Sequence, residues 1–201
     1  MESFFARMEP WRKPEGSLHL YVLPGEDETE RFTAAQSTLT DIEHLPLMPE
    51  AYLHCTVQRL AQFDDEVSQS QYTRLGEALE AFCSGMPAFD LQFRSPQADD
   101  VAVACWAADS PAWDALVSGC RDVVTDTWGV APPAPPASPH LSLAYAKGAV
   151  PHDLVESRVA DVTPLGTVHV SRLHLVSVTV RPERGTFDFT SLANWDLAPT
   201  S

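Results

Sequence analysis

Two short stretches of the chain pair a histidine with a hydroxyl residue at the same spacing. The first pair is His54 and Thr56, and the second is His140 and Ser142. Side chains alternate between two faces in an extended strand, so both members of a pair point the same way, while apolar neighbours form the other face. An imidazole exchanges protons near neutral pH and a hydroxyl donates a hydrogen bond. Each stretch therefore predicts one half of an acid–base active site.

A third copy of the pattern is present at His169 and Ser171. Arg172 follows it, where the other two copies place an apolar residue. The first two copies also sit centrally in alternating strands and lie in opposite halves of the chain. We therefore take the first two as the functional pair.

The two motifs, H-x-T-x and H-x-S-x, resemble the signature of the 2H phosphoesterase superfamily, which includes 2'-5' RNA ligase-like proteins and cyclic nucleotide phosphodiesterases. Three flanking features strengthen the resemblance: Met48-Pro49 before the first motif, the run Pro139 to Tyr145 around the second, and a closing strand that leads to Trp195. The similarity extends from about Leu18 to Trp195.

The resemblance implies an α+β, bilobal fold in which two antiparallel sheets flank a central cleft, with helices outside. It implies a single domain over residues 1–201, made of pseudo-symmetric lobes, with an irregular arm at 1–16. The implied activity is that of a phosphodiesterase acting on a 2',3'-cyclic phosphate, a 2'-5' linked small nucleotide or an RNA end. The catalytic residues it implies are His54, Thr56, His140 and Ser142.

Opening a phosphodiester requires one group to take a proton, another to give one, and donors to the phosphoryl oxygens. Two imidazoles can perform both proton transfers, and two hydroxyls can donate to the oxygens. No metal or other cofactor is expected, because no H-E-x-x-H or paired-cysteine spacing accompanies the histidines. The sequence does not tell which imidazole is the base.

Substrate contacts are expected from His19 and Tyr21, on one face of the first strand, from Gln58 at the end of the first motif, and from Arg172. Many 2'-5' RNA ligase-like enzymes place an arginine just after their second motif. Here the strand continues as Ala144-Tyr145-Ala146-Lys147, and Lys147 or Arg172 could replace the missing cation.

The chain of 201 residues is acidic, with a formal net charge of -15. Binding to duplex DNA, long RNA or an anionic membrane needs many Lys and Arg side chains, so we expect a small nucleotide or RNA-end substrate, no duplex DNA and no membrane partner. The four cysteines lack C-x-x-C spacing and are expected to be buried free thiols, as in a cytoplasmic protein. We expect a monomer.

Periodicity, caps and turn residues predict the order of elements. Expected strands are 18–23, 52–58, 89–93, 101–107, 138–144, 167–181 and 186–190. Expected helices are 26–43, 64–83, 110–128 and 153–159, with a turn at 97–100 and a proline-rich loop at 131–139.

Two further functions remain open. A nucleotide-binding module without turnover is consistent with the low basic content, and RNA ligation is the reverse chemistry. The acidity of the chain makes a partner as large as tRNA an unattractive choice for ligation.

Overall fold

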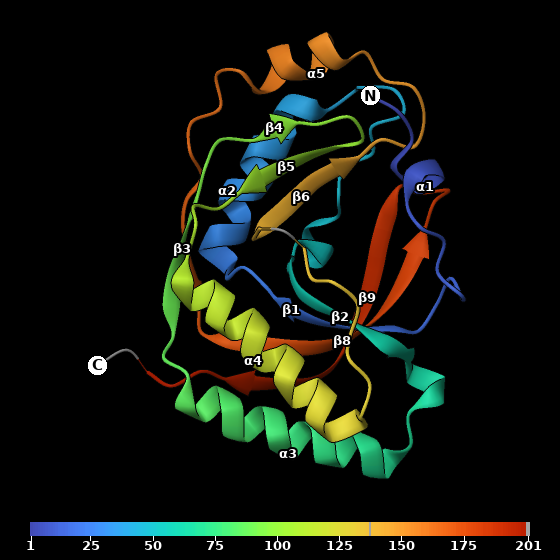
Figure 1. Cartoon of the computed structure of the whole chain (residues 1–201). Helices are drawn as coiled ribbons and strands as arrows, with labels where there is room; N and C mark the ends of the chain where they lie inside the picture. The colour runs from blue at the N-terminus through green and yellow to red at the C-terminus, as the bar shows by residue number, and fades with distance from the viewer. Residues whose placement is uncertain (137, 200–201) are drawn as a thin grey trace.

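The computed structural model describes residues 1–136 and 138–199 (Figure 1). The helices are α1 (Phe4–Arg7), α2 (Glu26–Gln36), α3 (Gln69–Gly85), α4 (Pro111–Trp128) and α5 (His152–Val159). The strands are β1 (Ser17–Val22), β2 (Cys55–Phe63), β3 (Phe89–Phe93), β4 (Gln97–Ala98), β5 (Ala102–Trp106), β6 (His140–Tyr145), β7 (Gly166–Val170), β8 (Arg172–Arg181) and β9 (Thr186–Asp196).

The strands form a seven-stranded antiparallel sheet in the order β4-β5-β6-β2-β1-β8-β9 and a two-stranded sheet, β3-β7. One residue pair, Cys55 with Leu141, joins β2 to β6. The large sheet therefore has two parts, β4-β5-β6 and β2-β1-β8-β9, that meet at this pair. The predicted α+β fold with two lobes and outer helices is confirmed, although each lobe mixes strands from both halves of the chain.

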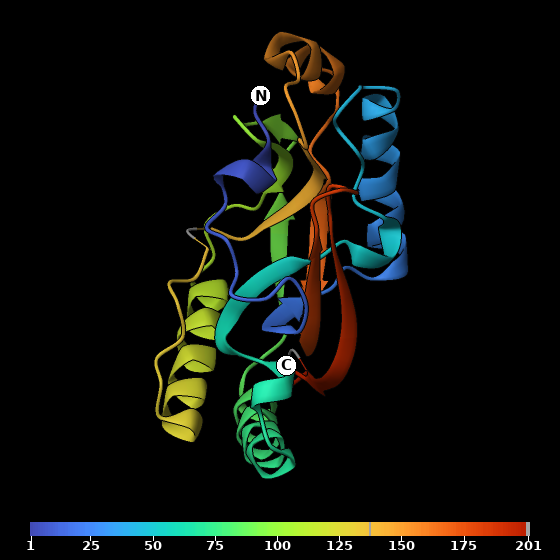
Figure 2. The ribbon, with the colours of Figure 1, turned by 90° about the vertical axis from the view of Figure 1, so that its right-hand side faces the viewer.

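The helices lie around the sheets (Figures 1 and 2). α3 and α4 pack side by side at one end of the molecule, and α5 lies at the other. Apolar side chains from nearly all elements form one contiguous core. All four cysteines are free and buried, as predicted. None of the helices in the described ranges is long and apolar enough to cross a membrane.

The caps of the two long helices come from serine. The Ser110 side chain accepts from the Trp113 backbone N–H, and Gly129 ends α4 at a φ of 70°, as the sequence predicts. α3 begins later than predicted, because Ser68 rather than the acidic pair at 64–65 forms its capping box, with Gln71. β2 instead continues to Phe63, so residues 64–66 form a separate short turn of helix.

Four other boundaries differ from the predictions. α2 ends at Gln36, because Ser and Thr side chains at 37–40 bond back to carbonyls and the chain then turns at Asp41, whose φ is 65°. The predicted strand 167–181 is two strands in different sheets, since β7 pairs with β3 and β8 with β1. Gln97 and Ala98 form β4 instead of a turn, and β9 extends to Asp196.

The predicted loop at 131–139 has no regular structure over its described residues, and residue 137 lies outside them. The arm before β1 is less irregular than predicted, because it contains α1. Gly16 ends the arm at a φ of 83°, and a Cβ there would lie 2.5 Å from a carboxylate oxygen of Asp64. Glycine is therefore required where the arm enters β1.

Candidate active site

The two predicted motifs meet at the junction of the lobes. β2 and β6 are neighbouring antiparallel strands, paired at Cys55 and Leu141. Residues flanking a paired position point to the opposite face of a sheet, so the motif side chains on either side of this pair share one face. We call it the motif face, and it carries His54, Thr56, His140 and Ser142.

The two motifs run in opposite directions at this junction, because β2 and β6 are antiparallel. Continuing the antiparallel pairing from Cys55 and Leu141 places His54 opposite Ser142 and Thr56 opposite His140. Each motif histidine therefore lies towards the hydroxyl residue of the other motif across the junction.

Both imidazoles are oriented in the same way. Nδ1 of His54 contacts the carbonyl oxygen of Tyr52 at 2.7 Å, and Nδ1 of His140 contacts that of Ser138 at 3.0 Å. A carbonyl only accepts, so in each ring Nδ1 carries the proton and donates. Nε2 is then the atom available for proton transfer in both residues.

An aromatic side chain from the adjacent strand supports each imidazole. The Tyr21 ring stacks on His54 with centroids 4.0 Å apart and an interplanar angle of 12°. The Trp106 ring lies against His140 at 4.6 Å. Because these rings limit rotation of the imidazoles, both Nε2 atoms keep a fixed direction.

The burial of His54 changes its protonation. Desolvation lowers the pKa of His54 from 6.5 to about 4, the hydrogen bond to the Tyr52 carbonyl opposes that shift, and the charge of His140 adds to it. The His54 imidazole is therefore neutral at pH 7. A neutral imidazole with a free Nε2 is suited to accept a proton.

A buried tyrosine supports each motif hydroxyl. Tyr21 is hydrogen-bonded to Thr56, and Tyr145 to Ser142. Burial raises the pKa of Tyr145 to about 12 and that of Tyr21 well above its usual 10. Both phenols stay protonated, so each motif hydroxyl has an uncharged hydrogen-bonding partner beside it.

A β-bulge follows the hydroxyl residue in both motif strands. The β1–β2 register skips Val57, and the β5–β6 register skips Leu143. An extra residue reverses the alternation of side chains beyond it. As a result Tyr145 lies on the motif face, where strict alternation after Ser142 would have turned it away.

The same bulge contradicts the prediction for Gln58. Its side chain is fully buried on the other face, where its amide nitrogen donates to the carbonyls of Arg59 and Pro133 and its oxygen accepts from Arg121. The prediction that Gln58 contacts substrate is wrong, because the extra residue at 57 turns it towards α4.

The other predicted substrate contacts have different surroundings. His19 and Tyr21 both lie on the motif face, with their rings 5.3 Å apart. Arg172 lies at the end of β8, where its Nε donates to Asp196 at 2.6 Å. A cavity of about 900 Å³ beside it is also lined by His174. Arg172 is therefore already paired with a carboxylate.

The motif face includes residues that the sequence did not mark as functional. Trp106, Tyr145 and Arg59 reach it through strand pairing and the bulges. Arg59 and Tyr145 each follow a motif histidine by five residues, which is the one sequence signal for them, and Trp106 has none. Within residues 1–136 and 138–199, no group of three or more His, Cys, Asp or Glu side chains is arranged to hold a metal ion.

The chain shares its fold with solved structures that include a phosphoesterase and LigT, so the resemblance seen in the motifs is confirmed at the level of the fold. TT0787 of Thermus thermophilus is similar at a TM-score of 0.72 and 20% identity, with 92% of this chain and 100% of that chain covered. A phosphoesterase is similar at 0.67 and 18%, with coverages of 91% and 99%.

LigT of E. coli in complex with NADP+ is similar at a TM-score of 0.67 and 17% identity, with 91% of this chain and 98% of that chain covered. Other LigT crystals contain 3'-AMP, ATP or phosphate. No family model matches the sequence, and no curated protein matches it either. The relationship is therefore visible in the fold and not in overall sequence identity.

Proposed function

We propose that this protein is a metal-independent phosphodiesterase that acts on a 2',3'-cyclic phosphate or on a 2'-5' linked small nucleotide or RNA end. The observation that carries the proposal is the meeting of the two motif strands at the lobe junction, where Cys55 pairs with Leu141. Nδ1 of each motif imidazole contacts a backbone carbonyl, which leaves Nε2 for proton transfer on the face that also carries the two hydroxyls.

Hydrolysis of a cyclic phosphate assigns a role to each of the four residues. Nε2 of His54, neutral at pH 7, takes the proton of the attacking water as the O–P bond forms. His140 gives a proton to the 2' or 3' oxygen as its bond to phosphorus breaks. Thr56 and Ser142 donate to the non-bridging oxygens, where negative charge increases. The product is a nucleoside monophosphate, and the two imidazoles exchange roles in the reverse direction.

Turnover of a nucleoside 2',3'-cyclic phosphate in excess chelator tests the proposal directly. His54→Asn or His140→Asn should lower kcat by about 10²- to 10⁴-fold, the usual contribution of a general acid or base. The control is His169→Asn, which changes the third His-x-Ser copy on β7 and should leave kcat intact. Activity retained in the His54→Asn, His140→Asn double variant would exclude the mechanism.

A nucleotide-binding module without turnover is the second candidate. Its support is the absence of an arginine directly after the second motif, where Tyr145 stands. Calorimetry with 3'-AMP distinguishes the two functions. Tight binding, with no product from any cyclic or 2'-5' linked substrate, would favour the module.

Ligation of RNA ends is the reverse reaction at the same site. The net charge of -15 opposes a partner as large as tRNA, because such binding gains its affinity from phosphate contacts with Lys and Arg. Measurable tRNA affinity at physiological salt would support ligation instead of hydrolysis. Four buried free thiols are consistent with the reducing cytoplasm, which fractionation would test. The expected monomer is tested by gel filtration.

A further inference from the structure

Arg59 occupies a special position relative to the two motifs. It follows His54 by five residues, as Tyr145 follows His140. Because each strand has a bulge after its hydroxyl residue, both side chains lie on the motif face, and Arg59 is paired across β1 with His19. Arg59 therefore places a cation on the motif face, at the position in the first motif strand that Tyr145 occupies in the second.

The Arg59 guanidinium is charged but unpaired in the described ranges. It makes no ion pair there, and its Nε is buried without a hydrogen-bond partner. Nδ1 of His19, directly across the strand pair, is also buried without a partner. Buried polar atoms normally have partners, so two neighbouring exceptions on one face point to a ligand-binding position.

His19 can act as a donor at this position. Its Nε2 lies 3.1 Å from the Ser17 hydroxyl, which can donate to it and leave the proton on Nδ1. Desolvation, then the charges of His54 and Arg59, lowers the pKa of His19 well below 6.5, so the ring is neutral. An anion between the two side chains would accept from Nδ1 of His19 and from Arg59 together.

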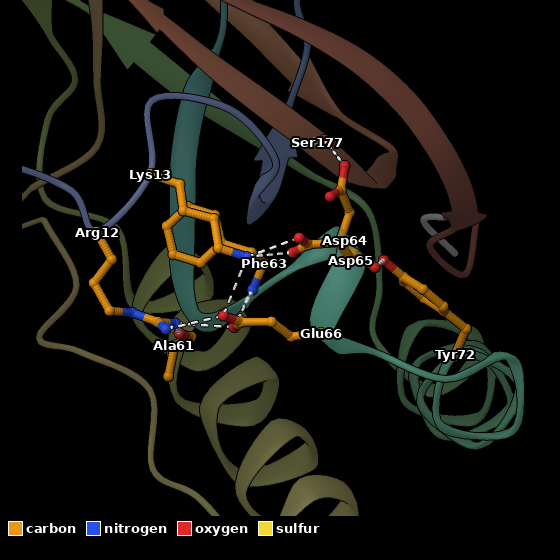
Figure 3. Close-up of polar contacts among 9 residues, drawn as sticks. All are labelled: Arg12, Lys13, Ala61, Phe63, Asp64, Asp65, Glu66, Tyr72 and Ser177. Carbon is orange, nitrogen blue, oxygen red and sulfur yellow. Dashed lines mark hydrogen bonds and ion pairs between the residues drawn. The ribbon is translucent and has the colours of Figure 1, made fainter.

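The N-terminal arm holds the guanidinium in place. The Trp11 ring lies 4.9 Å from the Arg59 guanidinium carbon and 5.3 Å from the His19 ring. Arg12 pairs with Glu66 at 2.9 Å, and both Arg12 and Lys13 lie over the Phe63 ring. Figure 3 shows Arg12 paired with Glu66, and Lys13 beside the Phe63 ring, at the end of β2. Trp11 is next to Arg12 in the chain, so the contacts of Arg12 also hold the Trp11 ring beside Arg59.

We propose that Arg59 and His19 form a subsite for a second phosphate of the substrate, next to the reacting one. The inference rests on the proposed function and narrows its substrates to cyclic or 2'-5' linked nucleotides that carry a further phosphate. Arg59 and His19 lie two residues along β1 from the pair Thr56 and Tyr21, which is about 7 Å at the rise of a strand. One small nucleotide can span that distance.

Calorimetry with 3'-AMP and adenosine 3',5'-bisphosphate tests the subsite without turnover. The protein should bind the bisphosphate about 10- to 100-fold more tightly, as expected for charged hydrogen bonds. Arg59→Gln should remove most of that ratio, and Arg74→Gln, at an exposed position on α3, should keep it. Equal binding of the two ligands by the wild type would overturn the subsite alone. Binding of neither would overturn the proposed function as well.

A second variant keeps the test decisive if Arg59→Gln does not fold. Glu9, on the arm, acts on the Arg59 charge without forming an ion pair with it in the described ranges. Glu9→Gln should raise the bisphosphate ratio several-fold, because it removes a competing negative charge. An unchanged ratio in Glu9→Gln would contradict the assignment.

Discussion

Acid should destabilise the folded protein through His54. The pKa of His54 is about 4 in the folded state, because the ring is desolvated, and 6.5 is its ordinary value. Between pH 4 and pH 6.5 the unfolded chain binds more protons at this group than the folded chain does. The contribution of the neutral ring to the free energy of unfolding is therefore complete above pH 6.5 and decreases as the pH is lowered towards 4. From pH 7 to pH 5 the loss from this group is about 2 kcal/mol, at 1.36 kcal/mol per pKa unit.

Urea unfolding at pH 7, 6 and 5 measures this loss when the wild type is compared with variants that cannot titrate. His54→Gln keeps a donor near the Tyr52 carbonyl, and His54→Phe keeps a ring on Tyr21. From pH 7 to pH 5 the free energy of unfolding of the wild type should decrease by about 2 kcal/mol more than that of either variant. If both variants give the same difference, proton binding by His54 is its cause. A difference that stays constant with pH would refute the assignment of His54 as a partly buried, neutral base.

Other substitutions test the remaining parts of the structure. Thr56→Val and Ser142→Ala should each lower kcat for a cyclic phosphate about 10²-fold with a smaller effect on KM, because their hydrogen bonds strengthen as charge develops; a pure KM effect would argue against that role. Gly119→Ala would place a Cβ 2.2 Å from the Phe82 ring, where α4 packs on α3, so thermal unfolding should show about 1 to 3 kcal/mol of destabilisation. Ser68→Ala removes the capping box of α3 and should cost about 1 kcal/mol, whereas the exposed Ser84→Ala should cost less.

Local sequence chemistry predicted the helix α4 and the two motif pairs. Ser110 and Gly129 mark the ends of α4 by capping rules that operate within a few residues. The pairing of His54 with Thr56, and of its counterpart, follows from alternation in a strand. These features depend on neighbouring residues alone, which is why they are visible without the fold.

Features that depend on strand pairing were not visible. The bulges at Val57 and Leu143 exist only relative to the partner strands. The bulge at Val57 reverses the faces of Gln58 and Arg59, and the bulge at Leu143 reverses that of Tyr145. The separation of β7 from β8 at Ser171 likewise depends on which strands each one pairs with, since the residues alternate through the break. Reasoning from the sequence therefore placed Gln58 on the motif face, where the structure instead places Arg59.

A crystal structure with 3'-AMP bound is the most direct test, because in the proposed mechanism both imidazoles contact the same phosphate. The prediction is that Nε2 of His54 and of His140 both lie within hydrogen-bond distance of the phosphate oxygens, with the Thr56 and Ser142 hydroxyls donating to the same group. A phosphate bound elsewhere, or held by only one of the two imidazoles, would contradict it.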